Sequence, residues 1–322
     1  SRLDASHVAP LSMPAALAGA AETSAQPFDP AKALNETPHS FAGAVNLYDD
    51  WAFSYDDTLL SWGYDAHLKI AELLAKYSSP EKAGTKDAPL MDCGCGTGLS
   101  GEAVAALGFR EIVGTDCSIV SLKQLFQKTI VSVGQKDKIE CVDIANKSSV
   151  EEAVIPLVSA KFSGEMFKST DITGRPTDTT VRFGNTSIPE NSSVTDATNP
   201  DAVRRCLYSS VALCNLEEPS TYEDSTFGAL ICVGVTSYVM NFTQMWAEVV
   251  RICKPGAIVV FTIRSTLWDP DENKVQSAAK ALDEAGKWKQ VYMSESSPYM
   301  PKNPVEEERL KTIYYCVYEV TK

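Results

Sequence analysis

The sequence predicts an α/β fold in which a Rossmann-like, doubly wound sheet of seven strands is covered by helices. Two observations predict it. From residue 90 onward, short apolar runs of strand length alternate with segments of helical period, an order that builds a parallel sheet. A glycine-rich turn at residues 94–98 separates the first strand from the first helix, where such sheets often carry a ligand-binding loop.

Composition excludes several classes of protein. The longest apolar stretches, around residues 229–235 and 257–263, are far shorter than the roughly 20 residues that a membrane-spanning helix needs. Asp and Glu (42) outnumber Lys and Arg (29), and the net charge of −13 repels nucleic acid over most of the surface. We therefore expect neither a membrane nor a nucleic acid as the main partner.

The nine cysteines show no repeated Cys-x-x-Cys pairs, and their number is odd. Most of them lie within apolar runs, as buried free thiols do. This pattern is typical of a reducing compartment, cytoplasmic or organellar, and gives no reason to expect a metal.

Residues 1–44 are predicted to be a disordered leader, because they are rich in Ala, Ser and Pro and show no sustained apolar period. They lack the arginine density typical of a transit peptide, so plastid targeting is left open. The domain itself is expected to span residues 45–322. It starts with an aromatic-rich stretch that ends in a helical period at residues 68–75.

The strands and helices of the sheet are expected in the following order. Two strands, each followed by a helix, occupy residues 90–93, 99–107, 112–115 and 119–128. An insertion at about residues 130–205, rich in Ser, Thr, Asn and Pro at its centre, separates the second helix from the third strand. The alternation then resumes with strands at 208–214 and 229–235, a helix at 242–253, a strand at 257–263, a helix at 275–285 and strands at 290–293 and 312–320.

The glycine-rich turn is the first candidate functional site. It runs Asp92-Cys93-Gly94-Cys95-Gly96-Thr97-Gly98 and directly precedes a helix. Glycine at every second position lets the backbone approach a ligand where a Cβ would collide, and the helix directs its N-terminal amides at the same place. This placement predicts a nucleotide-type ligand, although Gly-x-Gly also occurs in ordinary tight turns.

An acidic residue, Asp116, ends the second strand. Its distance along the chain from Asp92 is close to the interval of about 20 residues that precedes the ribose-binding acid in nucleotide-binding sheets. A carboxylate there can bind a ribose diol through two charge-assisted hydrogen bonds, each worth about 1.5–3 kcal/mol. Asp116 could instead cap the next helix, but Ser118 could cap it equally well, and we favour the ribose role.

Binding sites for NAD and for S-adenosylmethionine (SAM) share this layout, so the pattern of glycines has to distinguish between the two ligands. A dinucleotide site favours Gly-x-Gly-x-x-Gly, which seats a pyrophosphate. Here the run Asp-x-Gly-x-Gly-x-Gly resembles the first motif of class I SAM-dependent methyltransferases, and Lys254-Pro255-Gly256 resembles another hallmark of that family. The resemblance implies SAM as cofactor, S-adenosylhomocysteine (SAH) as product, and cofactor contacts at the loop and strand ends from Asp92, Gly94, Cys95, Gly96, Gly98, Leu99, Asp116, Cys117, Val233 and Gly234.

Four stretches resemble, more closely, the methyltransferase family of the Williams–Beuren syndrome chromosome region: LYDDWAFSYDDTLLSWGY, DCGCGTGLSGEAVAALGF, ALICVGVTSYV and RICKPGAIVVFTIR. The resemblance covers roughly residues 46–128 and 206–318. In such enzymes the aromatic N-terminal segment folds over the cofactor as a lid, which implies that Tyr48, Trp51 and Tyr55 cover the methionine end of SAM. The alternative is that these aromatic side chains only pack against the sheet.

Two segments could supply the third strand. One ends near Asp143, close behind the second helix, and the other spans residues 207–216. The second resembles the family pattern, with Asn215 in place of the usual acid before Leu216, and an amide can still bond to the edge of an adenine. We favour Asn215-Leu216, because Asp143 would require a gap of about eighty residues. Gly228 also departs from the family, which usually has an Asp at the start of the fourth strand.

Methyl transfer is a direct displacement at the sulfonium methyl group. It needs the acceptor atom within about 3–3.5 Å and in line with the leaving sulfur, and such positioning is worth roughly 7–11 kcal/mol. Aromatic faces near the sulfonium add about 0.5–2 kcal/mol by cation–π attraction. Outside the predicted leader His67 is the only histidine, and we expect it to be a packed or surface residue. We therefore assign no catalytic residue and expect catalysis by proximity, which suits a thioether, a neutral amine or a mildly acidic group.

The substrate is expected at the end of the fifth strand, where Arg264 is a candidate clamp for a carboxylate. The alternative is a surface arginine paired with Asp269 or Glu272. Three features suggest a carboxylate-bearing thioether such as 4-methylthio-2-hydroxybutyrate as the acceptor. They are the lack of a candidate base, the position of Arg264, and a resemblance to algal enzymes that make dimethylsulfoniopropionate. Tyr238, Trp268 and Tyr299 are expected to form an aromatic wall around the substrate. The alternative is that they belong to the core.

Three functions are compatible with these expectations. The first, which we favour, is a SAM-dependent methyltransferase acting on a small metabolite. The second is a protein methyltransferase that uses the insertion to bind a partner chain. The third is a SAM-binding scaffold without catalysis, to which the departures at Asn215 and Gly228 give slight support. RNA modification is disfavoured, since no basic stripe occurs in the sequence.

Overall fold

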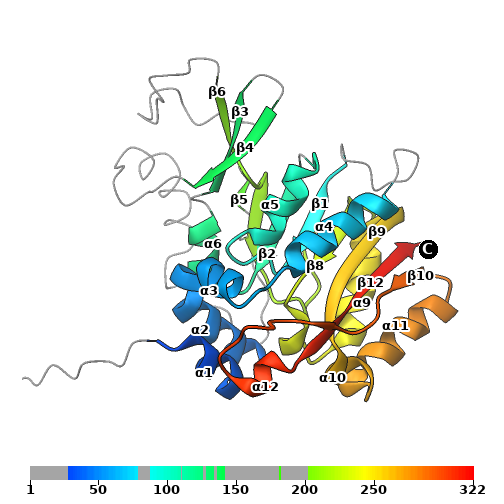
Figure 1. The fold of residues 1–322 in the computed structure, drawn as a ribbon. Helices are drawn as coiled ribbons and strands as arrows, with labels where there is room; N and C mark the ends of the chain where they lie inside the picture. The colour runs from blue at the N-terminus through cyan, green and yellow to red at the C-terminus, as the bar shows by residue number, and fades with distance from the viewer. Residues whose placement is uncertain are drawn as a thin grey trace, which may run out of the picture.

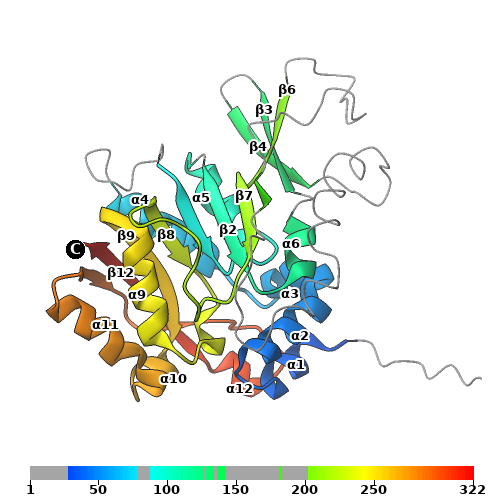
Figure 2. The same cartoon turned by 180° about the vertical axis from the view of Figure 1, so that it is seen from behind.

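A computed structural model describes residues 28–78, 88–109, 111–125, 128–133, 136–141, 181–182 and 202–322. Within them the chain forms one large mixed sheet, a separate small sheet, and helices on both faces of the large one (Figures 1 and 2). The strands are β1 (Leu90–Cys93), β2 (Ile112–Asp116), β3 (Lys128–Val133), β4 (Lys136–Cys141), β5 (Val181–Arg182), β6 (Ala202–Cys206), β7 (Ser210–Leu213), β8 (Phe227–Cys232), β9 (Cys253–Arg264), β10 (Trp288–Met293), β11 (Ser297–Pro298) and β12 (Thr312–Val320).

The large sheet has the order β10-β12-β9-β8-β1-β2-β7-β5, and β11 pairs with β12. The five strands β7, β2, β1, β8 and β9 are parallel, while β12 lies antiparallel between β9 and β10. Strands β1, β2 and β8 are buried along their whole length, as expected for a sheet covered on both faces. The predicted doubly wound sheet is confirmed, with the short strands β5 and β11 added to its seven.

Helices cover the two faces of this sheet in two sets (Figures 1 and 2). Helices α4 (Ala66–Tyr77), α5 (Leu99–Ala106) and α6 (Ile119–Leu125) contribute buried side chains to one apolar cluster. Helices α9 (Phe242–Ile252) and α11 (Val275–Glu284) contribute to the cluster on the other face. Asn241 caps α9, since its side chain accepts a hydrogen bond from the backbone N–H of Gln244.

The third strand of the sheet is β7, which pairs in parallel with β2 from Val113 to Asp116. The strand β4, which ends at Cys141, belongs instead to the small antiparallel sheet β4-β3-β6. Of the two candidates for the third strand, the one that leads to Asn215 is therefore correct; Asp143 itself lies outside the described residues. The small sheet occupies the place of the predicted insertion, between α6 and β7 (Figure 1).

The N-terminal boundary of the domain was predicted too late. Helix α1 (Pro30–Glu36) and the start of α2 (Phe41–Trp51) lie within the predicted leader. Asp29 caps α1 and is followed by proline at the first helical position, and the side chain of Ser40 caps α2. These caps, and the burial of Ala31 and Leu34 in the core, are the local signals for an ordered segment that the overall composition concealed.

Two other boundaries also differ from the sequence prediction. Lys128 begins strand β3 instead of ending a helix. Lys254-Pro255-Gly256 lies inside β9, which starts at Cys253, although the sequence predicts a strand only from residue 257. The remaining helices are α3 (Tyr55–Ser61), α10 (Ser265–Trp268) and α12 (Glu306–Arg309), with short turns of 3₁₀ helix at Ala52–Ser54, Thr236–Tyr238 and Glu272–Lys274.

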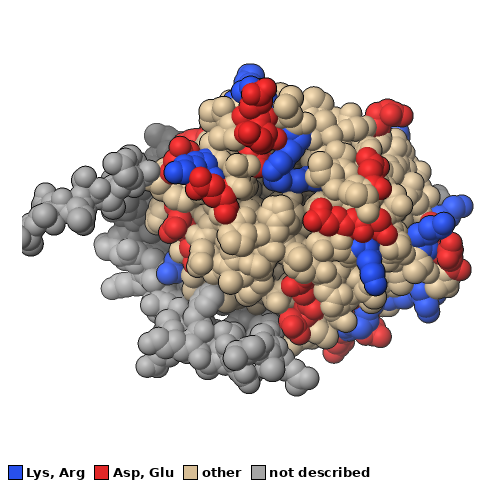
Figure 3. Space-filling model, turned by 90° about the horizontal axis from the view of Figure 1, so that it is seen from below, with Lys and Arg blue, Asp and Glu red and all other residues tan. Residues whose placement is uncertain are grey.

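Three further properties of the described residues concern membrane spans, metal sites and cysteines. Among the described residues, no helix has the length and apolar character needed to cross a membrane, and no cluster of side chains is suited to a metal ion. Every cysteine whose side chain is described is a free thiol, and most are buried. Acidic and basic side chains are interspersed on the face seen in Figure 3.

Candidate functional site

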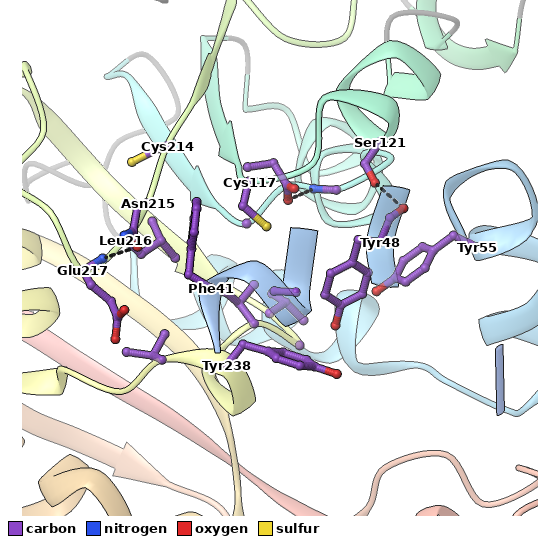
Figure 4. A pocket seen from close by; sticks show the side chains of 18 residues that line it. Phe41, Tyr48, Tyr55, Cys117, Ser121, Cys214, Asn215, Leu216, Glu217 and Tyr238 are labelled. Atoms are coloured by element: carbon purple, nitrogen blue, oxygen red, sulfur yellow. Dashed lines mark hydrogen bonds between the residues drawn. The ribbon is translucent and has the colours of Figure 1, made fainter. Parts of the chain in front are cut away.

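The candidate site is a cavity of about 720 Å³ at the carboxyl ends of β1, β2, β7 and β8. Its position is the usual one for a ligand in open α/β sheets. In Figure 4 the residues after β7 lie on one side of the cavity and the N-terminal helices on the other. The lining residues are Phe41, Ala44, Tyr48, Tyr55, Gly94, Gly96, Asp116, Cys117, Ser121, Cys214, Asn215, Leu216, Glu217, Val233, Gly234, Val235, Tyr238 and Val239.

The glycine loop forms one wall of the cavity. Gly94, Gly96 and Gly98 all have positive φ angles of 52° to 98°, which glycine adopts without strain. A Cβ on Gly94 would lie 2.1 Å from Val235, so this glycine is required by packing. A Cβ on Gly96 would meet no protein atom within 4 Å, and since Gly96 lines the cavity, that space is open to a ligand.

Asp116 faces the cavity from the end of β2. Its carboxylate accepts hydrogen bonds from the backbone N–H of Gly96 (2.8 Å) and of Ser118 (2.7 Å). Burial raises the pKa of Asp116 to about 6, and these hydrogen bonds partly oppose that rise. The carboxylate is therefore held rigidly, is ionised at neutral pH, and has lone pairs left for a ligand.

A smaller cavity adjoins this one across the glycine loop and is lined by Tyr64, His67 and Leu99 among others. Asp92, predicted as a cofactor contact, lines neither cavity. It is fully buried beneath the loop, where its Oδ2 accepts hydrogen bonds from Ser100 Oγ (2.6 Å) and Tyr208 OH (2.7 Å). Its Oδ1 has no partner among the described residues. Burial raises the pKa of Asp92 to about 6. These two hydrogen bonds join β1 to α5 and to the segment before β7.

Asn215 and Leu216 line the cavity directly after β7. The side-chain oxygen of Asn215 accepts a hydrogen bond of 3.1 Å from the backbone N–H of Glu217 (Figure 4). Because this bond uses the oxygen, the amide NH₂ is left as a donor. Glu217 in turn accepts from the backbone N–H groups of Met240 and Asn241, which fixes the chain ahead of α9.

The aromatic N-terminal segment covers the cavity. Tyr48 and Tyr55 line it, with ring centroids 5.9 Å apart in an edge-to-face arrangement, and Tyr238 approaches Tyr48 at 5.8 Å (Figure 4). Trp51, by contrast, lies within the core, 1% exposed, and packs on Tyr55 with centroids 4.8 Å apart. Burial raises the pKa of Tyr48 and of Tyr55 well above the usual value, so both phenols stay protonated.

Two carboxylates attach this segment to the sheet. Asp49 accepts a hydrogen bond of 2.6 Å from Ser118 Oγ, at the start of α6. Asp56 accepts from the Thr97 hydroxyl in the glycine loop and pairs with Lys128 at 2.6 Å. Lys128 is buried and also pairs with Glu102 of α5 at 2.5 Å. The covering segment is thus bonded to the glycine loop after β1 and to the turn after β2.

Arg264 is buried, 6% exposed, and lies one layer behind the cavity wall. Its guanidinium group is 5.8 Å from the ring centroid of Tyr299 and 3.5 Å from Glu308, so the surface pairing with Asp269 or Glu272 is wrong. Glu308 is fully buried and pairs with Lys311 as well. Two cations therefore share one carboxylate, and Arg264 Nε has no partner among the described residues.

The other predicted substrate residues have mixed positions. Tyr238 lines the cavity, but Trp268 is part of the core cluster on the opposite face of the sheet. Tyr299 is buried with its hydroxyl over Gly234, since a Cβ on that glycine would lie 3.0 Å from it. Of the predicted cofactor residues, Cys95 and Leu99 line only the smaller cavity, and Gly98 lines neither.

The sequence did not identify several lining residues. Phe41 and Ala44 were overlooked because they lie in the predicted leader. Cys214, Glu217, Val235 and Val239 are direct neighbours of predicted positions, and Ser121 lies one helical turn after Cys117. His39 also lies in the predicted leader, and its ring packs edge-on against Tyr238 with centroids 5.5 Å apart. Burial, with the charges of Arg264 and Lys311, lowers the pKa of His39, so a neutral imidazole lies beside the cavity wall.

No protein-family model matches this chain, and no curated protein sequence matches it. Several solved structures resemble it distantly. A chain from the complex of the Haloferax volcanii Trm112 methyltransferase activator with a methyltransferase is 13% identical over 85% of this chain and 98% of its own, with a TM-score of 0.43. Geranyl diphosphate C-methyltransferase from Streptomyces coelicolor is 10% identical over 78% of each chain, with a TM-score of 0.40. The cyclase SpnF is 13% identical over 79% of this chain and 80% of its own, with a TM-score of 0.41. Likenesses this distant assign neither a family nor an activity.

Proposed function

We propose that this chain is a SAM-dependent methyltransferase that acts on a small metabolite. The observation that carries the proposal is the chemistry of the main cavity, which is lined by the carboxylates of Asp116 and Glu217, by three tyrosines and by no lysine or arginine among the described residues. An acidic and aromatic cavity favours a positively charged ligand, whereas the pyrophosphate of a dinucleotide needs cations or a set of donors around it.

The order of strands in the sheet also favours SAM over a dinucleotide. In the classic dinucleotide-binding order 3-2-1-4-5-6, the fifth strand has a parallel neighbour on its outer side. Here the strand beside β9 is the antiparallel β12. The departure from the dinucleotide order agrees with the resemblance to class I methyltransferases that the sequence motifs carry.

The lining residues fit SAM in three parts. Asp116 would accept hydrogen bonds from the ribose diol, and Asn215 would donate its free amide NH₂ to the adenine edge. The missing Cβ of Gly96 leaves room for the ligand at the loop. The rings of Tyr48, Tyr55 and Tyr238 would surround the sulfonium, where each aromatic face contributes about 0.5–2 kcal/mol.

Bound SAM would supply an electrophilic methyl group on a positively charged sulfur. The chain contributes positioning and the exclusion of water, because the aromatic segment is bonded over the cavity through Asp49 and Asp56. Tyr48 and Tyr55 stay protonated and act as neutral rings and donors. The lining of the main cavity includes no lysine or histidine among the described residues, so its chemistry suits an acceptor that needs no deprotonation.

The acceptor is proposed to be a small carboxylate-bearing thioether, such as 4-methylthio-2-hydroxybutyrate. Arg264 and Lys311 share the carboxylate of Glu308, and the positive charge of Arg264 lies 5.8 Å from the ring centroid of Tyr299. That charge favours an anionic group on the acceptor side. A thioether has no proton to lose, so the neutral His39 beside Tyr238 would have no proton to accept.

The test is a panel of small metabolites incubated with the enzyme and SAM and assayed for released SAH. The proposal predicts release with at least one carboxylate-bearing thioether, and none from Asp116→Ala. For that acceptor, His39→Gln should change the rate by less than about threefold; a loss of about 100-fold or more would instead indicate a proton-bearing acceptor that needs a base. SAH binding without release from any acceptor would support the scaffold function.

A further inference from the structure

A buried lysine lies where the covering segment, the glycine loop and the small sheet meet. Lys128 is 5% exposed, and its Nζ pairs with two carboxylates, Asp56 of α3 at 2.6 Å and Glu102 of α5 at 2.5 Å. The other oxygen of Asp56 accepts a hydrogen bond from the Thr97 hydroxyl in the glycine loop. The function proposed above gives Lys128 and Glu102 no role.

Lys128 carries its charge in this buried position. Burial by itself would lower its pKa, but the charges of Asp56 and Glu102 and their hydrogen bonds outweigh burial, so the pKa lies above the usual value. A buried ammonium group that loses its only anionic partner is strongly destabilising. Because Lys128 has two such partners, it can lose one and keep the other.

Glu102 and Lys128 are held in place without the help of Asp56. Lys128 begins β3, where it pairs with Cys141 of β4, and its carbonyl oxygen accepts a hydrogen bond from the N–H of Leu207 at 3.4 Å. Helix α5, which carries Glu102, contacts β4 and packs into the core through Val104. The Lys128–Glu102 pair therefore belongs to the body of the domain.

Asp56, by contrast, belongs to a part of the covering segment that is held less firmly. It lies in the first turn of α3, whose N-terminus has no side-chain cap among the described residues. Phe53, in the 3₁₀ turn before α3, is 79% exposed. The side chain of Asp56 is 28% exposed, so water can solvate it when its contacts break. Its neighbour Tyr55 lines both cavities, and movements of such covering segments often limit the exchange of ligands.

We propose that Lys128 and Glu102 are positioning residues that set how readily the covering segment opens. When a ligand enters or leaves, the segment opens at the contacts of Asp56 with Lys128 and Thr97, and Glu102 keeps Lys128 paired while the segment is open. Opening then breaks one ion pair and one hydrogen bond without leaving a buried charge unpaired. The inference rests on the proposed SAM function, because the ligand used to test it is SAH.

The test measures the rate constants of SAH association and dissociation by stopped-flow tryptophan fluorescence, for the wild-type chain and for two variants. Asp56→Asn weakens the contacts that close the segment, and Glu102→Gln weakens the contact that remains when the segment is open. Lys128 keeps one carboxylate in either variant, so neither variant strands its charge in the closed state. Asp57→Asn and Glu72→Gln are the matched controls, because they remove the same charge at exposed positions.

We expect the two variants to change the rates in opposite directions. Asp56→Asn should raise both rate constants about threefold to tenfold, because the closed state loses a charge-assisted contact. Glu102→Gln should lower both by a similar factor and leave the dissociation constant within about twofold, because the open state loses the only carboxylate beside Lys128. Both controls should keep the wild-type rate constants within about twofold.

A purely structural role would change the rates in the same direction in both variants, since each variant loses one ion pair. Changes of the same sign, or no change in either variant, would therefore overturn the roles of Lys128 and Glu102, while SAH binding by the wild-type chain would still support the SAM function. If the wild-type chain binds neither SAM nor SAH, the SAM function is wrong and this inference is wrong with it.

Discussion

The carboxylate of Asp116 accepts a hydrogen bond of 2.8 Å from the backbone N–H of Gly96. Through this bond the end of β2 fixes the glycine loop that follows β1, at the point where the missing Cβ of Gly96 leaves the cavity open. One residue thus shapes the loop and presents a charge to the ligand. The predictions that follow separate these two roles.

Asp116→Asn can keep the hydrogen bond from Gly96, because its amide oxygen still accepts, but it loses the bond from Ser118 and the charge that the ribose diol would bind. We expect SAH binding to weaken by about 1.5–3 kcal/mol for each charge-assisted hydrogen bond lost. Burial places the pKa of Asp116 at about 6, so the wild-type affinity for SAH should fall as the pH drops below 6. Calorimetry between pH 5 and 8 measures both effects. An Asn variant that keeps the wild-type pH dependence would show that another group is responsible.

Gly96→Ala should abolish ligand binding and leave the fold intact. Its Cβ would enter open space in the cavity, and the φ angle of 52° is strained only moderately for alanine. Gly94→Ala is the matched comparison, because its Cβ would lie 2.1 Å from Val235 and should destabilise the protein itself. Thermal melts combined with SAH titration distinguish the two. Normal SAH binding by Gly96→Ala would mean that the ligand lies elsewhere.

Asp92 should make stability fall as the pH rises. Burial raises the folded-state pKa of Asp92 from 3.8 to about 6, so the unfolded chain loses its proton first, and ionisation then favours unfolding. The contribution is present below about pH 4 and is lost as the pH rises to 6; the difference between 3.8 and about 6 corresponds to roughly 3 kcal/mol. Asp92→Asn should therefore show a flatter dependence of the free energy of unfolding on pH between 4 and 7, measured with urea. An unchanged slope would contradict this assignment.

Asp56→Ala should loosen the aromatic segment over the cavity. It removes the bond to Thr97 and the ion pair with Lys128, which keeps Glu102 as its remaining partner. We expect SAH to dissociate several-fold faster, with a loss of about 1–2 kcal/mol in the free energy of unfolding. Stopped-flow displacement measures the rate. The exposed neighbour Asp57 serves as control, and equal rates for Asp56→Ala and Asp57→Ala would count against a role for the segment as a cover.

Most of the fold could be predicted from the sequence because it depends on local patterns. The strand–helix alternation and the acid at the end of β2 appear in the chain order, and the predicted doubly wound sheet agrees with the structure. Side-chain direction could not be predicted in the same way. Trp51 and Tyr55 are close in sequence, yet one lies in the core and the other in the cavity.

The largest errors concern residues whose contacts are with residues far away in the sequence. Composition assigned residues 30–44 to a leader, although Phe41 and Ala44 line the cavity and His39 reaches Tyr238. Arg264 is paired with Glu308, 44 residues away, rather than with the acids nearby. Such contacts depend on how the N-terminal and C-terminal segments meet over the sheet, which periodicity does not encode.

The central claim is that the cavity at the ends of β1, β2, β7 and β8 binds the adenosine and the sulfonium of SAM. Isothermal titration calorimetry of the full chain with SAM, SAH and NAD tests it most directly. We expect saturable heat with SAM and with SAH, weakened in Asp116→Asn, and none with NAD. Heat with NAD and none with either SAM or SAH would contradict the account.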